Sequence, residues 1–124
     1  MAKQVLIVED EPMLRDLLAE EFQDAGFVVT KAADGVEGQQ VFEKSGPFDY
    51  VICDISMPRM RGDELQRWAS QECTEKRKTS KWMALTAYMP GDVADFKEEE
   101  FDVVFYKPIS FRLVLNWVHS QKNY

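Results

Sequence analysis

The stretch VLIVEDE, residues 5–11, runs from four apolar residues directly into three consecutive acids. A second apolar run, YVIC at residues 50–53, also ends in a carboxylate, Asp54. Short apolar runs of this kind are typical of buried strands, and open α/β sheets bind ligands at the carboxyl ends of their strands. Close carboxylates repel each other by about 4 kcal/mol per pair at an effective dielectric of about 20. The cluster therefore needs a cation, a shared proton or a basic side chain, and oxygen ligands favour a hard cation such as Mg²⁺.

The composition indicates one soluble domain that spans residues 1–124, because 45% of the chain is hydrophobic. A net charge of −7 argues against direct nucleic-acid binding, which needs clustered Lys and Arg. Two cysteines make neither a disulfide framework nor a zinc site. With no signal peptide and no apolar stretch long enough to cross a membrane, we expect a cytoplasmic protein whose partners are proteins.

Strand and helix signals alternate along the whole chain. Strands are expected at residues 4–8, 27–31, 50–53, 82–86 and 103–106, and helices at 12–25, 35–45, 63–73, 91–100 and 110–121. Pro12 suits a first helical turn, Gly26 a helix end, and Ser110 an N-cap. The polar, basic segment 74–81 is interpreted as a solvated loop.

Five such units predict an α/β fold, a doubly wound parallel sheet of five strands with five helices on its two faces. Right-handed crossovers leave few strand orders, and the flavodoxin-like order 2-1-3-4-5 makes the first and third strands neighbours. In that order Glu9, Asp10 and Asp54 converge at one site. The sequence favours this order over the alternatives without excluding them.

Four short motifs resemble the receiver domain of two-component response regulators. They are VEDEP at 8–12, CDISMP at 53–58, LTA at 85–87 and KP at 107–108. The resemblance covers essentially the whole chain, with the motifs in the family's order, and is closest to stand-alone, chemotaxis-like receivers. It implies a phosphorylation-activated signalling switch rather than an enzyme that acts on outside substrates.

The resemblance also implies roles for the acidic residues. Asp54 would accept the phosphoryl group, and Asp10 and Asp54 would bind Mg²⁺ together with the backbone carbonyl of Ser56. Glu9 would act through a metal-bound water. Taken alone, Asp10 and Glu11 could instead be favourable charges at a helix N-terminus.

Three further positions complete the implied site. Lys107 would pair with Asp54 and then with a phosphoryl oxygen, and its peptide bond to Pro108 is often cis in this family. The hydroxyl of Thr86 and the backbone N–H of Ala87 would hold another phosphoryl oxygen. Taken singly, Thr86 could be strand filler and Lys107 a surface lysine.

The resemblance implies a phosphodonor, either a sensor histidine kinase or a histidine phosphotransfer protein. The output would be a protein target or an output domain absent from this chain, and apolar residues of the last helix could form a homodimer surface. Three rivals stay open: a degenerate receiver acting as a constitutive interaction module, a phosphatase-like enzyme, and a flavin binder.

The chain also departs from the family pattern. Many receivers carry Tyr or Phe where this chain has Val104, so we expect the aromatic switch to be absent or rewired through Phe105 or Tyr106. Ser56 and Tyr88 occupy the two variable positions that tune dephosphorylation in the family. Two flanking arginines, Arg59 and Arg61, and the acidic run 98–100 are interpreted as solvated, and His119 as a surface or packing residue.

Overall fold

The computed structural model describes residues 2–87 and 96–121. Their strands form one parallel sheet in the order β2-β1-β3-β4-β5, which confirms the predicted order. The strands are β1 (Gln4–Val8), β2 (Val28–Ala32), β3 (Tyr50–Asp54), β4 (Lys81–Thr86) and β5 (Val103–Tyr106). The central strands β1 and β3 are buried over nearly their whole length, as their unbroken apolar sequences predict.

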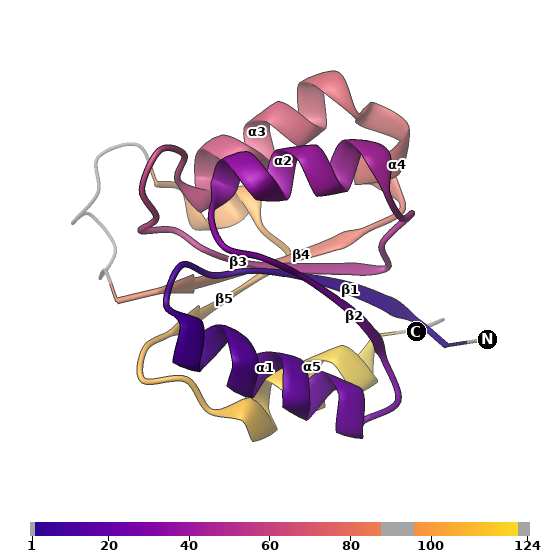
Figure 1. The fold of residues 1–124 in the computed structure, drawn as a ribbon, viewed down its shortest axis with the longest axis vertical. Helices are drawn as coiled ribbons and strands as arrows, with labels where there is room; N and C mark the ends of the chain where they lie inside the picture. The colour runs from indigo at the N-terminus through magenta and orange to yellow at the C-terminus, as the bar shows by residue number, and fades with distance from the viewer. Residues whose placement is uncertain (1, 88–95, 122–124) are drawn as a thin grey trace.

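Helices cover both faces of the sheet (Figure 1). One face carries α2 (Gly35–Lys44), α3 (Gly62–Glu72) and α4 (Thr74–Lys78), and the other carries α1 (Pro12–Asp24) and α5 (Phe111–Ser120). Each face has its own apolar cluster, with Phe42 of α2 and Trp82 of β4 on one face and Phe22 of α1 and Ile52 of β3 on the other. This doubly wound arrangement is the predicted fold.

Local sequence explains where the helices begin and end. The proline at residue 12 starts α1, and Gly26 follows its end with a φ of 95°, a conformation that favours glycine. The carboxylate of Asp34 accepts a hydrogen bond from the backbone N–H of Glu37 and caps α2. The hydroxyl of Ser110 caps α5 in the same way, as predicted.

Two predictions on the α4 side are corrected. Residues 74–78 form a short helix instead of a solvated loop, because the ammonium of Lys76 donates to the carbonyls of Phe42, Glu43 and Ser45 at the end of α2. The predicted helix 91–100 falls partly outside the described residues. Its described part is non-helical at 96–97 and forms only a 3₁₀ turn, η1 (Glu98–Glu100).

None of the helices among the described residues has the length and apolar character needed to cross a bilayer.

Candidate functional site

Adjacent strands bring the acidic residues together at the carboxyl edge of the sheet. The pairing of β1 with β3 matches Val8 to Cys53, so Glu9, which directly follows β1, and Asp54, the last residue of β3, are acids at the same edge. Carboxylate oxygens of Glu9, Asp10 and Asp54 lie within 4.8 Å of one another. Glu9 and Asp54 are buried and Asp10 is exposed. We call these three residues the acidic cluster.

The end of β5 delivers a cation to this cluster. The backbone N–H of Lys107 donates to the carbonyl of Thr86 at 2.7 Å, which holds the residue beside the end of β4. Its ammonium lies 2.8 Å from Asp54 Oδ2 and 3.8 Å from Glu9 Oε2. The peptide bond between Lys107 and Pro108 is cis, as the resemblance implied.

The charges of the cluster are only partly balanced. Three carboxylates face one ammonium, which leaves two negative charges when all groups are ionised. Burial, followed by the charge of Asp54, raises the pKa of Glu9 to about 8. Burial alone would lower the pKa of Lys107, but its hydrogen bond to Asp54 and the nearby carboxylates outweigh that effect and raise it.

One buried carboxylate oxygen of the acidic cluster accepts no hydrogen bond from the described residues. Glu9 Oε1 accepts the backbone N–H of Glu11, whereas the buried Glu9 Oε2 accepts no hydrogen bond from the described residues. A buried oxygen of this kind is unfavourable unless a ligand or water satisfies it. Its position, the oxygen-only donor set and the excess of two negative charges all fit a divalent hard cation.

The other predicted site residues lie at the same edge. The backbone N–H of Ser56 donates to Asp54 Oδ1 at 3.1 Å, and the serine itself is exposed. Thr86 is buried at the end of β4, one residue beyond Leu85, the register partner of Asp54. The next residue, Ala87, is exposed, and Tyr88 lies outside the described residues.

Val104 and Phe105, neighbours near the end of β5, pack on opposite faces of the sheet. Val104 packs with the cluster under α2 and α3, and Phe105 with the cluster under α1 and α5. Tyr106 is the register partner of Thr86, and 36% of its surface is exposed. Of Phe105 and Tyr106, Tyr106 is therefore the residue that lies opposite Thr86 in the strand register.

Sequence reasoning missed a second group of charges. Asp63 is fully buried and bonds to the guanidinium of Arg61, and Arg67 binds Glu100. The interpretation of Arg61 and Glu100 as solvated is therefore wrong, while Arg59 is largely exposed and forms an ion pair with Asp34. An Asp and an Arg four positions apart in the predicted helix 63–73 were the available signal.

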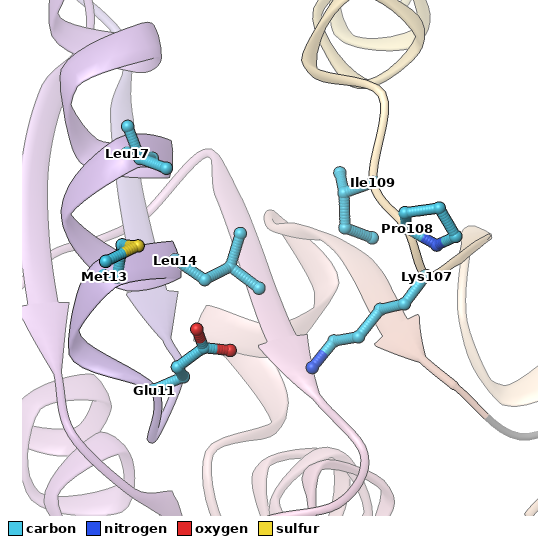
Figure 2. A pocket seen from close by; sticks show the side chains of 7 residues that line it. All are labelled: Glu11, Met13, Leu14, Leu17, Lys107, Pro108 and Ile109. Atoms are coloured by element: carbon cyan, nitrogen blue, oxygen red, sulfur yellow. The ribbon is translucent and has the colours of Figure 1, made fainter.

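A cavity of about 270 Å³ opens beside Lys107, between α1 and the connection from β5 to α5. Figure 2 shows the lysine and the carboxylate of Glu11 near one another at one end and apolar side chains along the rest. Two of these apolar residues are exposed, Met13 with 71% and Leu17 with 43% of its surface in solvent. An apolar surface therefore continues from the site along α1.

Comparison with known proteins identifies the family. The model of the response regulator receiver domain matches residues 5–119, and the chain belongs to that family. Receiver domains are signalling switches of two-component systems.

Solved structures agree over nearly the whole chain. The chemotaxis response regulator CheY4 of Vibrio cholerae superposes with a TM-score of 0.82 at 27% identity, covering 96% of this chain and 98% of that one. The response regulator TrrA of Thermotoga maritima, solved in complex with Mg²⁺–BeF, has a TM-score of 0.79 at 32% identity. The match covers 94% of this chain and 96% of that one.

A curated relative is much longer than this chain. The Regulator of RpoS of Escherichia coli is 46% identical over 65 residues, which is 52% of this chain and 19% of that protein.

Proposed function

We propose that the chain is a phosphorylation-activated switch in which Asp54 accepts a phosphoryl group from a phosphohistidine in a Mg²⁺-dependent reaction. One observation carries this proposal: a buried carboxylate at the end of β3 lies between two further acids and a lysine, and two negative charges are unbalanced when all of these groups are ionised. The membership in the receiver family supports it.

The proposed reaction is a transfer between two nucleophiles. An oxygen of Asp54 forms a bond to phosphorus while the bond from phosphorus to the donor imidazole nitrogen breaks. That nitrogen keeps the electron pair of the broken bond, and the imidazole leaves as a neutral ring because its other ring nitrogen carries a proton. A carboxylate is a weak nucleophile, so positioning and charge neutralisation have to lower the barrier.

The residues around Asp54 supply that positioning. Lys107, already 2.8 Å from Asp54 Oδ2, would exchange the carboxylate for a phosphoryl oxygen. The Thr86 hydroxyl and the Ala87 backbone N–H would hold a second oxygen. These donors are fixed by β4 and β5 before the reaction, so little reorganisation is needed.

Asp10, Asp54 and the carbonyl of Ser56 would hold the Mg²⁺, and Glu9 would bind one of its waters. The ion would offset the repulsion between the carboxylates and the charge that develops on the phosphoryl group. A structure of the relative TrrA contains Mg²⁺–BeF, and beryllofluoride has the tetrahedral shape of a phosphoryl group.

The donor would be a sensor histidine kinase or a histidine phosphotransfer protein, which suits a site in the cytoplasm. Its histidine has to approach Asp54 from the open edge of the sheet. The apolar cavity beside Lys107 (Figure 2), with Met13 and Leu17 exposed along it, lies next to the lysine that contacts Asp54. We infer that the donor contacts this surface.

Phosphorylation would change protein binding rather than catalysis on outside substrates. The modification adds charge and strong acceptors at one edge of the sheet. Apolar residues of α5, with Leu113 59% exposed, offer a surface for a target, an output domain or a second copy. With Val104 where many receivers have an aromatic ring, Tyr106 beside Thr86 would relay the change.

Intact-mass spectrometry with Mg²⁺ and acetyl phosphate tests the proposal. We expect one phosphoryl adduct that is absent in Asp54→Asn and absent without Mg²⁺. Lys107→Ala should slow adduct formation by about a hundredfold, the scale on which one preorganised donor acts. The exposed Lys78→Ala is the matched control and should react at the wild-type rate.

A folded wild-type protein that gains no adduct from acetyl phosphate, or from a donor protein, would contradict the proposal. The alternative would then be a degenerate receiver that binds its partners without phosphorylation.

A further inference from the structure

A set of four charged residues links α3 to the turn before β5. We call Arg61, Asp63, Arg67 and Glu100 the ionic bridge. Asp63 accepts from Arg61 Nε at 2.9 Å and from Arg61 Nη2 at 2.6 Å, and Arg67 Nη2 lies 3.2 Å from its Oδ2. Arg67 also donates two hydrogen bonds of 2.9 Å to the carboxylate of Glu100.

The buried member of the bridge is fully paired. Asp63 is 0% exposed, whereas the side chains of Arg61 and Arg67 are about one-third exposed. Burial alone would raise the pKa of Asp63, but the hydrogen bonds and charges of the two arginines outweigh it and lower the pKa. A buried ion pair contributes little net stability compared with apolar residues, so the bridge calls for a reason other than stability.

At one end, the bridge is attached to the backbone of the phosphoryl acceptor. Asp63 directly follows Gly62, which packs so closely that an added Cβ would lie 2.3 Å from the carbonyl oxygen of Asp54. The Gly62 N–H also donates to the carbonyl of Ile55 at 3.2 Å. The ends of the loop 55–62 are thereby held against each other beside Asp54, and Ser56 lies within that loop.

At the other end, the bridge is attached to the strand that carries Lys107. Glu100 lies in η1, shortly before β5, and Lys107 follows that strand directly. The contacts therefore form a closed path from Asp54 through the loop 55–62, the bridge and β5 to Lys107. The ion pair between Lys107 and Asp54, at 2.8 Å, completes the path.

We propose that Asp63 and Arg67 are positioning residues for the phosphoryl site, an inference that rests on the proposed function. Through Glu100 they fix the loop 55–62 relative to β5. The carbonyl of Ser56 and the ammonium of Lys107 then stand in the correct places around Asp54. A small displacement of such groups is costly, since about 1 Å of misplacement can reduce a rate by about a hundredfold.

Glu100→Gln tests the bridge at its partly exposed end, where the variant is expected to fold. Glu99→Gln is the matched control, because Glu99 carries the same charge in the same turn, is exposed, and forms no ion pair with the described residues. We expect Glu100→Gln to weaken Mg²⁺ binding, measured by calorimetry with MgCl₂, and to slow adduct formation from acetyl phosphate. Each effect should be about tenfold, while Glu99→Gln stays at the wild-type values.

Arg67→Gln and Arg67→Lys extend the test to the centre of the bridge. Lysine keeps the charge but loses the bidentate hydrogen bonding of arginine. The Mg²⁺ dissociation constant of Arg67→Lys should therefore fall between those of the wild type and Arg67→Gln. A purely structural bridge would lower the melting temperature and leave the dissociation constant of the folded protein unchanged. That result would overturn the inference.

The two proposals fail in different ways. If the wild type gains the adduct and Glu100→Gln and Arg67→Gln match Glu99→Gln, the positioning role is wrong and the proposed function stands. If the wild type gains no adduct and binds no Mg²⁺, the proposed function fails, and the positioning role fails with it.

Discussion

The acidic cluster and the ionic bridge both contain a fully buried carboxylate, but the surroundings shift the pKa values of these two carboxylates in opposite directions. Asp63 has two arginines around it, and its pKa is lowered. Glu9 has one distant ammonium at 3.8 Å and one oxygen without a hydrogen bond from the described residues, and its pKa is raised to about 8.

The net charges of the two groups also differ. The ionic bridge contains two acids and two arginines and is neutral, whereas the acidic cluster with Lys107 carries two excess negative charges when all of its groups are ionised. A neutral, fully bonded group needs no further ligand. An incompletely paired group at the carboxyl edge of a parallel sheet fits the proposed ligand site, and its excess negative charge fits one divalent cation.

Removing one acid from each group should change stability in opposite directions. Asp63→Asn should lower the free energy of unfolding by about 3 kcal/mol, because it leaves two arginines without their buried partner. Glu9→Gln should raise it by up to about 5 kcal/mol in Mg²⁺-free protein near pH 9, because burial raises the pKa of Glu9 from 4.5 to about 8 and one pKa unit corresponds to about 1.4 kcal/mol.

Urea unfolding with excess chelator measures both values. Glu20→Gln, on the exposed side of α1, is a control that should change neither. Two variants that destabilise the protein equally would contradict the distinction between the groups.

A smaller effect should appear in the pH dependence of Asp63→Asn. The pKa of Asp63 is lower in the folded state than in the unfolded chain, so its stabilising contribution is complete above about pH 4 and is lost as the pH falls through the lowered value. The stability difference between wild type and Asp63→Asn should therefore shrink below about pH 4, by at most about 1.4 kcal/mol per pH unit. Urea unfolding at a series of acidic pH values tests this, and a constant difference would show that Asp63 is not held in its ionised form.

The sheet and the acidic cluster could be predicted because their determinants are local. Apolar runs end in acids at Glu9 and Asp54, and the alternation of strands and helices favours the observed strand order. Once β1 and β3 are neighbours, no further information is needed to place these carboxylates together. The role of Lys107 was predicted from the family resemblance, because a lysine at the end of a strand has no distinctive local signal.

The contact between Arg67 and Glu100 and the position of α4 could not be predicted because their determinants are distant in sequence. Arg67 and Glu100 are 33 residues apart, and a run of three acids ordinarily indicates a solvated surface. The polar segment 74–78 lacks apolar periodicity, and its Lys76 bonds to carbonyls at the end of α2, more than 30 residues away. A single sequence carries no local signal for either contact.

The most direct test of the central claim is calorimetric titration of the protein with MgCl₂, with Asp10→Asn and Glu11→Gln alongside. These variants remove the same charge from adjacent exposed residues, but only Asp10 belongs to the acidic cluster. We predict that one Mg²⁺ binds the wild type and Glu11→Gln with similar affinity and that Asp10→Asn loses binding. Absence of Mg²⁺ binding to the wild type, or equal binding by both variants, would contradict the assignment of the unbalanced cluster as the ligand site.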